Sequence, residues 1–167
     1  MAQANIGGRG MPKTNELYDR DFFLWTQEQA AALRAVKNSN LPLDWANLAD
    51  EIESLGKSDR RQLRSQIRRI LRHLLKLEVS PALDPRGGWC STIADSRSEI
   101  EDVLDDSPSL RREIDRMIAE ELDAAAKFAA ADLRQYGEAA EAVWARLGNG
   151  GFTAEQVLGD WFPEASG

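Results

Sequence analysis

The stretch from Leu43 to Glu78 constrains the fold more than any other part of the chain. Apolar residues recur in it every three or four positions, which is the spacing of one face of an α-helix. Its second half contains an apolar seam made of Leu63, Ile67, Ile70, Leu74 and Leu77, widened by Leu71 and Leu75. A helix with so broad an apolar stripe must pack against other helices. The stretch therefore predicts a helix bundle.

Cap and turn residues divide the chain before Pro81 into three predicted helices. The first covers Tyr18 to Lys37. The second begins after Asp44, a favourable N-cap, and is expected to stop at Gly56. The expected inner face of that second helix consists of Trp45, Leu48, Ile52 and Leu55. Ser58 is expected to cap a third helix that runs to about Val79.

The rest of the chain predicts two long helices and two short ones. The fourth helix is expected from about Trp89 to Asp105, and the fifth from Ser107-Pro108 to about Leu133. The expected inward residues of the fifth helix are Leu110, Ile114, Met117, Ile118, Leu122, Ala125 and Phe128. A short helix to about Leu147 and another capped by Thr153 follow. No segment alternates as a strand would. The sequence predicts an all-α antiparallel bundle of four to five main helices plus short C-terminal helices, with residues 1–14 as a flexible tail and 15–167 as a single helical domain.

The charges are strongly segregated. Residues 57–76 contain eight Lys or Arg and one Asp, a net charge of +7, whereas the whole chain is −7, so the remainder carries −14. The resulting basic face comprises Arg60, Arg61, Arg64, Arg68, Arg69, Arg72 and Lys76. Such a face could bind phosphates, but it contains no aromatic residue on which bases could stack. We favour ion pairs with acids of neighbouring helices, among them Glu53, Glu99, Glu101, Asp102, Asp115 and Glu120.

A candidate polar cluster consists of Glu51, Glu53, Arg68, Arg72 and His73. Carboxylates beside a core and near a histidine could bind a divalent metal or act as a general base. A single histidine cannot complete the paired Glu-x-x-His sites of di-iron bundles. We therefore favour pairing of Glu51 or Glu53 with arginines of the following helix, and a packing role for His73 at the edge of the core. No metal and no cofactor are predicted.

Cys90 is the one cysteine of the chain. With His73 it supplies the residue types of a nucleophilic Cys–His pair, and it lies near an expected helix start that would stabilise a thiolate. Inert packing is the favoured interpretation. A lone cysteine excludes an intrachain disulfide framework and suits a reducing cytosol. The first fourteen residues lack an apolar core typical of signal peptides, and no apolar run is long enough to span a membrane. A cytoplasmic protein with no membrane contact is expected.

Several short motifs follow one another along the chain: Leu17-Tyr18-Asp19-Arg20-Asp21-Phe22 with Trp25, Asn47-Leu48, Glu51-Ile52-Glu53-Ser54-Leu55-Gly56, His73-Leu74-Leu75-Lys76, Trp89, Ile93, Arg97, Ser107-Pro108-Ser109-Leu110 and Phe162-Pro163-Glu164. Their order and spacing resemble the bacterial family of domain of unknown function 29, DUF29. The resemblance covers nearly all of residues 17–164. It implies a compact all-helical domain and brings no activity, ligand or catalytic residue.

Three functions follow from these patterns. The leading prediction is a non-catalytic module that binds a protein partner or associates with itself. The second is a nucleic-acid-associated protein that uses residues 57–76, and the third is a metal-dependent or Cys/His enzyme. The terminal pair Trp161-Phe162 either folds back on the bundle or docks on another subunit, and folding back is favoured.

Overall fold

The computed structural model describes residues 14–37 and 39–164. The elements are α1 Thr14–Arg20, α2 Phe22–Ala35, α3 Trp45–Val79, α4 Arg86–Asp106, the 3-10 helix η1 Pro108–Glu113, α5 Ile114–Gln135, α6 Glu141–Leu147 and α7 Ala154–Leu158. This part of the chain contains no strand, which confirms the predicted all-α bundle with short C-terminal helices. The predicted tail falls on residues outside the described range, apart from Thr14, which begins α1.

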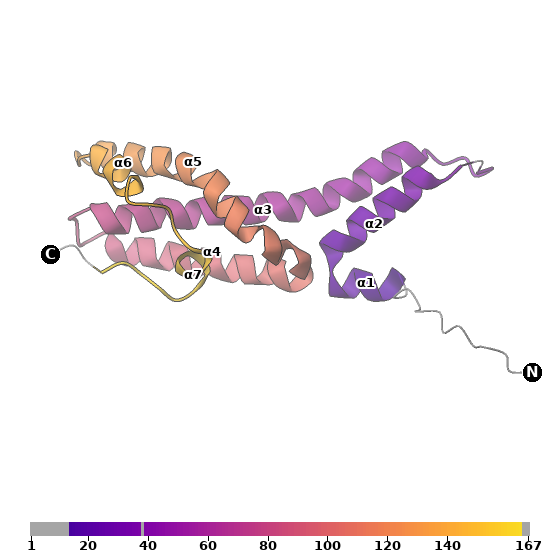
Figure 1. Cartoon of the computed structure of the whole chain (residues 1–167), viewed down its shortest axis with the longest axis horizontal. Helices are drawn as coiled ribbons and strands as arrows, with labels where there is room; N and C mark the ends of the chain where they lie inside the picture. The colour runs from indigo at the N-terminus through magenta and orange to yellow at the C-terminus, as the bar shows by residue number, and fades with distance from the viewer. Residues whose placement is uncertain (1–13, 38, 165–167) are drawn as a thin grey trace, which may run out of the picture.

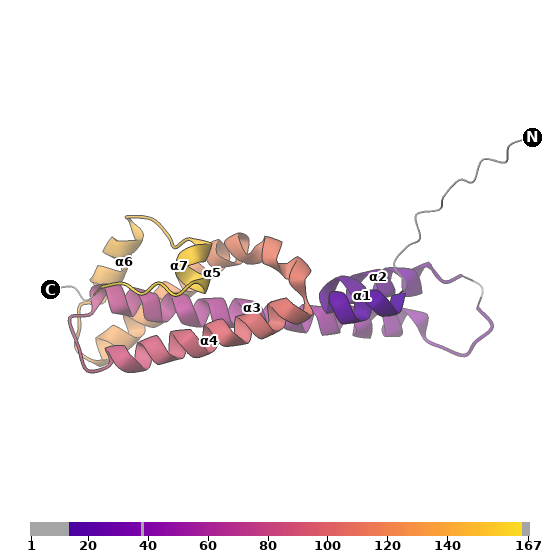
Figure 2. The same cartoon turned by 90° about the horizontal axis from the view of Figure 1, so that it is seen from below.

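The long helix α3 organises the molecule (Figure 1). Its second half packs against α4 and α5, while its first half packs against α2. Figure 2 shows α1 and α2 beside the part of α3 that extends beyond the end of α4. We call residues 14–37 and 39–56 the arm and residues 57–164 the bundle. The two regions therefore share one helix.

Gly56 lies inside α3 rather than at the end of a helix. The sequence predicted a helix end at Gly56 and a new cap at Ser58, and this prediction is wrong, because α3 is continuous from Trp45 to Val79. Gly56 is buried, and a Cβ atom added to it would lie 2.2 Å from Thr26 Oγ1 and 3.2 Å from the Phe23 ring. The glycine thus lets α2 approach the backbone of α3 closely. Its role is packing rather than chain reversal.

Other helix boundaries follow local capping chemistry. Asp44 caps α3, as predicted, because its Oδ1 accepts a hydrogen bond from the Asn47 N–H at 3.1 Å. Thr153 and Gln156 form the reciprocal capping box that starts α7. The expected single helix over 18–37 is instead interrupted at Asp21, which caps α2. The expected fifth helix begins as η1 and becomes α-helical only at Ile114.

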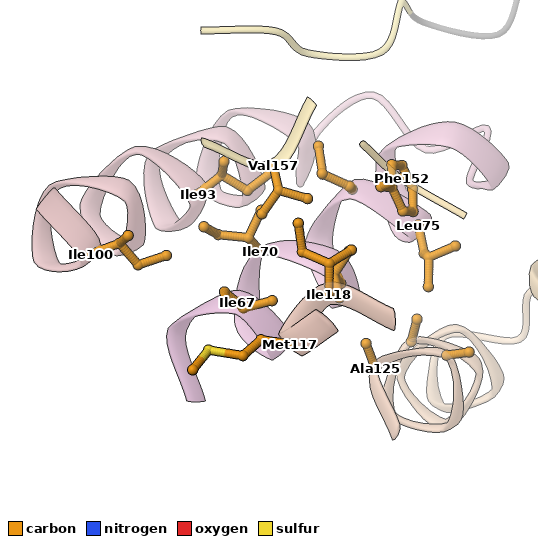
Figure 3. Close-up of a cluster of buried hydrophobic side chains, with 14 of the residues drawn as sticks. Ile67, Ile70, Leu75, Ile93, Ile100, Met117, Ile118, Ala125, Phe152 and Val157 are labelled. Atoms are coloured by element: carbon orange, nitrogen blue, oxygen red, sulfur yellow. The ribbon is translucent and has the colours of Figure 1, made fainter. Parts of the chain in front are cut away.

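The core lies where α3, α4, α5 and the C-terminal segment meet (Figure 3). Side chains from α3, α4, α5 and α7 converge there, with Phe152 from the α6–α7 connection. All seven apolar side chains predicted for the seam of α3 are fully buried. Three other predictions are wrong, because Leu48, Leu55 and Phe128 are 40%, 49% and 48% exposed. Their helices have the expected periodicity, but no described element covers these positions.

The base of the arm is fixed to the bundle by polar contacts. The Asp21 carboxylate accepts a hydrogen bond from the Leu24 N–H at 2.9 Å and another from the Ser109 N–H at 2.7 Å. Ser107 Oγ accepts from the Phe23 N–H at 3.1 Å and donates to Asp59 Oδ2 at 2.9 Å. The break between α1 and α2 is therefore a junction at which the arm meets the start of η1.

Candidate functional site

The predicted polar cluster does not converge on one place. Glu51 and Glu53 lie on the arm, whereas Arg68, Arg72 and His73 lie in the bundle half of α3. Twenty residues of helix separate Glu53 from His73, a distance of about 30 Å along the axis. Among the described residues there is also no group of three His, Cys, Asp or Glu side chains that could hold a metal ion. The structure therefore does not assemble the metal or acid–base site that these residue types would allow.

The two arm carboxylates have different surroundings. Glu53 Oε2 accepts from Arg34 of α2 at 2.8 Å and lies 3.3 Å from Lys57 Nζ. Hydrogen bonds from Arg34 and Lys57 lower the pKa of Glu53. Glu51 is exposed, and no ion pair joins it to another described residue. The expected pairing with arginines of the following helix is wrong for both residues, because Glu53 binds an arginine of α2 and the lysine one turn ahead of it.

Most cations of the basic face form ion pairs with acids of η1 and α5. Arg60 pairs with Glu113 at 2.5 Å, Arg64 and Arg68 share Glu121 at 2.6 and 2.8 Å, and Arg72 and Lys76 share Asp132 at 2.5 and 3.0 Å. Ion pairs within the chain were expected. Of the acids expected from the sequence, only Glu120 pairs with a described residue of the basic face, at 3.5 Å from Arg64. The phosphate-binding surface suggested by the sequence is thus largely occupied by carboxylates.

Arg61 and Arg69 are the exceptions in the basic face. Both side chains are exposed. Within residues 39–164, no carboxylate lies at ion-pair distance from either guanidinium. They are consequently the two cations of the face that remain available to a partner.

Asp132 is the acid of an ion-pair group that includes the buried Lys76. Burial alone would raise its pKa, but hydrogen bonds from Arg72 and Lys76 outweigh burial and lower it. Lys76 is 5% exposed, and its ammonium lies 4.6 Å from the centre of the Trp89 ring. The group borders a groove of about 1030 Å³ that also exposes Leu83. Its two cations share one carboxylate, so it contributes an ion-paired wall with a formal charge of +1.

His73 is held in its neutral form. Burial, followed by the charges of Lys76 and Arg72, lowers its pKa to about 4. At neutral pH the ring is therefore uncharged, as expected for a packing residue. No hydrogen bond joins His73 to Cys90 among the described residues, and Cys90 packs against the apolar core. The geometry offers no support for a Cys–His nucleophile.

Sequence reasoning missed the role of two arginines of α4. Arg97 is 8% exposed and donates to the backbone oxygens of Val157 and Trp161 at 2.9 and 2.8 Å. Arg86 donates to the Leu77 and Pro163 oxygens. The C-terminal segment, including Trp161 and Phe162, thereby folds back on the bundle (Figure 2). The sequence did contain a signal. Arg97 is four residues after Ile93 and three before Ile100, so it lies on the apolar face of the helix.

The arm differs from the bundle in its exposed apolar surface. Six of the ten large hydrophobic side chains exposed by the described residues belong to it, although it is the smaller region. They are Tyr18, Val36, Leu41, Leu43, Leu48 and Leu55. Exposed apolar groups gathered in one region are a common property of protein-binding surfaces. The arm is therefore the best candidate for a functional surface.

Comparisons with known proteins agree with this helical architecture. The family described as "Domain of unknown function DUF29" matches residues 17–162. The chain is similar to an alpha-helical protein of unknown function from Rhodospirillum rubrum, whose crystal structure superposes with a TM-score of 0.68. That likeness has 25% sequence identity and covers 87% of this chain and 91% of the other. No curated protein matches the chain. Within the described residues, no helix is both long and apolar enough to cross a membrane.

Proposed function

Since the chain belongs to the DUF29 family, which has no assigned activity, we propose from the structure that it is a non-catalytic protein-interaction module. Its binding surface is the arm. The observation that carries this proposal is the exposure of four leucines in the arm: Leu41 and Leu43 before α3, and Leu48 and Leu55 on its first half. Removing such side chains from water is the main favourable contribution to most protein association. The lone Cys90 is consistent with work in a reducing bacterial cytoplasm.

The charge distribution supports a protein partner over a nucleic acid. Five cations of the basic face already contact carboxylates of η1 or α5. A phosphate backbone would have to displace those carboxylates, and the net charge of −7 repels it. A protein surface can instead bind the apolar arm without breaking any of these pairs.

The proposal is tested by changing the arm while leaving the bundle intact. The arm variant is Leu43→Ser/Leu55→Ser, and the matched control is Leu83→Ser, which changes a leucine that is 69% exposed at the opposite end of α3. Each purified protein is used to capture binding proteins from a bacterial lysate, and its own mass is measured by light scattering. We expect the wild type and the control to associate equally well. The amount of associated protein should be at least tenfold lower for the arm variant. Equal behaviour of both variants would contradict the proposal.

A further inference from the structure

A face without an intramolecular partner runs along the exposed side of α3. Seven positions are spaced alternately three and four residues apart, and all are exposed: Leu48, Glu51, Leu55, Ser58, Gln62, Ser65 and Arg69. Because successive helix residues are about 100° apart, this stripe lies on the side turned away from Gly56 and hence from α2. None of the seven side chains makes an ion pair or hydrogen bond with another described residue. The spacing is that of the a and d positions of a coiled coil, with Leu48 and Leu55 as the apolar members and polar residues at the other five positions.

We propose that a second copy of this chain packs on the stripe in antiparallel orientation. Leu55 then lies opposite Ser58 of the partner subunit, and Leu48 lies opposite Ser65 of the partner subunit. Each of these two leucines meets a small serine, which is the alternation that allows facing helices to interdigitate. The arrangement is two-fold symmetric, so every contact occurs twice. This inference rests on the proposed function, since it uses the arm, and it specifies the partner.

The charges are complementary in the same register. Glu51 lies opposite Gln62 of the partner subunit and beside the partner's Arg61, while Asp44 lies opposite the partner's Arg69. Arg61 and Arg69 are the two cations of the basic face that lack an acid at ion-pair distance within the described residues. The pairing therefore joins the acidic start of α3 to the remaining free cations. Such complementarity fixes register and favours encounter.

A hollow on the bundle has a suitable position for the partner's leucine. It has a volume of about 150 Å³ and is lined by Ser65, Arg68, Arg69, Arg72 and Phe128. In the proposed register Leu48 of the partner subunit enters it from above Ser65 and contacts the half-exposed Phe128 ring. The pairing thus covers Leu48, Leu55 and Phe128, the three side chains whose predicted burial the single chain does not provide.

Charge exchange tests the pairing. In Glu51→Arg alone, arginine faces arginine across the interface, and in Arg61→Glu alone, glutamate faces glutamate. We expect each single variant to raise the dimer dissociation constant at least tenfold in sedimentation experiments. An equimolar mixture of the two should form a heterodimer with nearly wild-type affinity, because both contacts are then complementary. Exposed Glu101→Arg and Arg112→Glu are matched controls expected to dimerise normally.

A disulfide test reads the register directly. In a Cys90→Ser background, a chain with Leu48→Cys is mixed with one carrying Ser65→Cys and oxidised. We expect a cross-linked dimer, whereas Leu48→Cys mixed with Ser98→Cys should give none. A wild-type chain that stays monomeric at millimolar concentration would overturn the inference, and so would a dimer indifferent to charge exchange. After either result, the proposed function still holds if the arm variant loses binding to a different protein partner. The proposed function itself fails if changes in the arm alter no association at all.

Discussion

The arm and the bundle use the same helix and the same periodicity, yet the arm buries its apolar residues only in part. In the bundle half of α3, Leu63, Ile67 and Leu74 are completely covered. In the arm half, Leu48 and Leu55 recur with similar spacing and remain 40% and 49% exposed. Periodicity shows which residues share a face, but coverage depends on a neighbouring element. The difference therefore lies in the neighbouring elements, and it is the basis of the partner surface proposed above.

The largest contrast is expected from leucine truncation in the two regions. Leu74→Ala, in the fully buried seam, should lower the free energy of unfolding by about 3 kcal/mol, since it leaves a cavity in the core. Leu41→Ala, at a side chain that is 61% exposed, should change it by less than about 0.5 kcal/mol. Urea unfolding followed by circular dichroism measures both. Equal losses would break the distinction between the regions.

Gly56→Ala should damage the arm selectively. Alanine favours a helix by about 1 kcal/mol over glycine, but its Cβ would overlap Thr26 Oγ1 and push α2 away. We expect a net loss of about 2 kcal/mol in the docking of α2. Hydrogen exchange should speed up in α2 and not in α4, and adding Thr26→Ala should restore part of the protection. Uniform destabilisation of both helices would show that arm and bundle unfold together.

Glu121→Gln tests whether the basic face depends on internal carboxylates. Glu121 is 4% exposed and pairs with both Arg64 and Arg68, so its neutralisation should lower stability by about 1.5 kcal/mol. The exposed Glu120→Gln should cost less than about 0.5 kcal/mol. Combining Glu121→Gln with Asp132→Asn should also increase retention on a heparin column, because four cations each lose one carboxylate partner. Unchanged retention would mean that the cations of the basic face remain unavailable to heparin even without these two carboxylates.

The smallest effect is a pH dependence that arises in the bundle. His73 has a pKa of about 4 in the folded chain, below the usual 6.5, so the unfolded chain binds its proton more readily. The stabilising effect of the neutral ring is complete above about pH 6.5 and is lost as the pH falls towards 4. Because the ring is partly solvated, we expect a loss of about 1 kcal/mol rather than the full value of the shift. His73→Gln should flatten the stability profile between pH 6.5 and 4 relative to wild type, and an identical profile would exclude this cause.

The sequence predicted those features that depend on neighbouring residues. The seam of α3, the Asp44 cap and the Thr153 capping box follow from spacing and side-chain chemistry within one turn or one helix. The continuity of α3 through Gly56 could not be predicted in this way, because it depends on how closely α2 approaches. A glycine at a helix end and a glycine at a helix crossing look alike in one sequence.

The candidate site was harder to predict for the same reason. The basic face was evident, but its partners Glu121 and Asp132 depend on α5 docking beside α3. Glu121 did carry a signal, since it lies in register with the buried Met117, Ile118 and Ala125. Arg97 showed the same signal on α4. A charged residue in an apolar register identifies a buried pair or clamp without identifying what it binds.

The continuity of α3 also determines the thermodynamics of anything that binds the arm. The helix has 35 residues and is about 52 Å long, and no loop interrupts it between the two regions. The arm is therefore pre-organised, since folding of the bundle has already removed the conformational entropy that a hinged or disordered arm would lose on binding. Association should then resemble rigid-body docking, in which the rate is limited by orientation and the affinity is set mainly by dissociation.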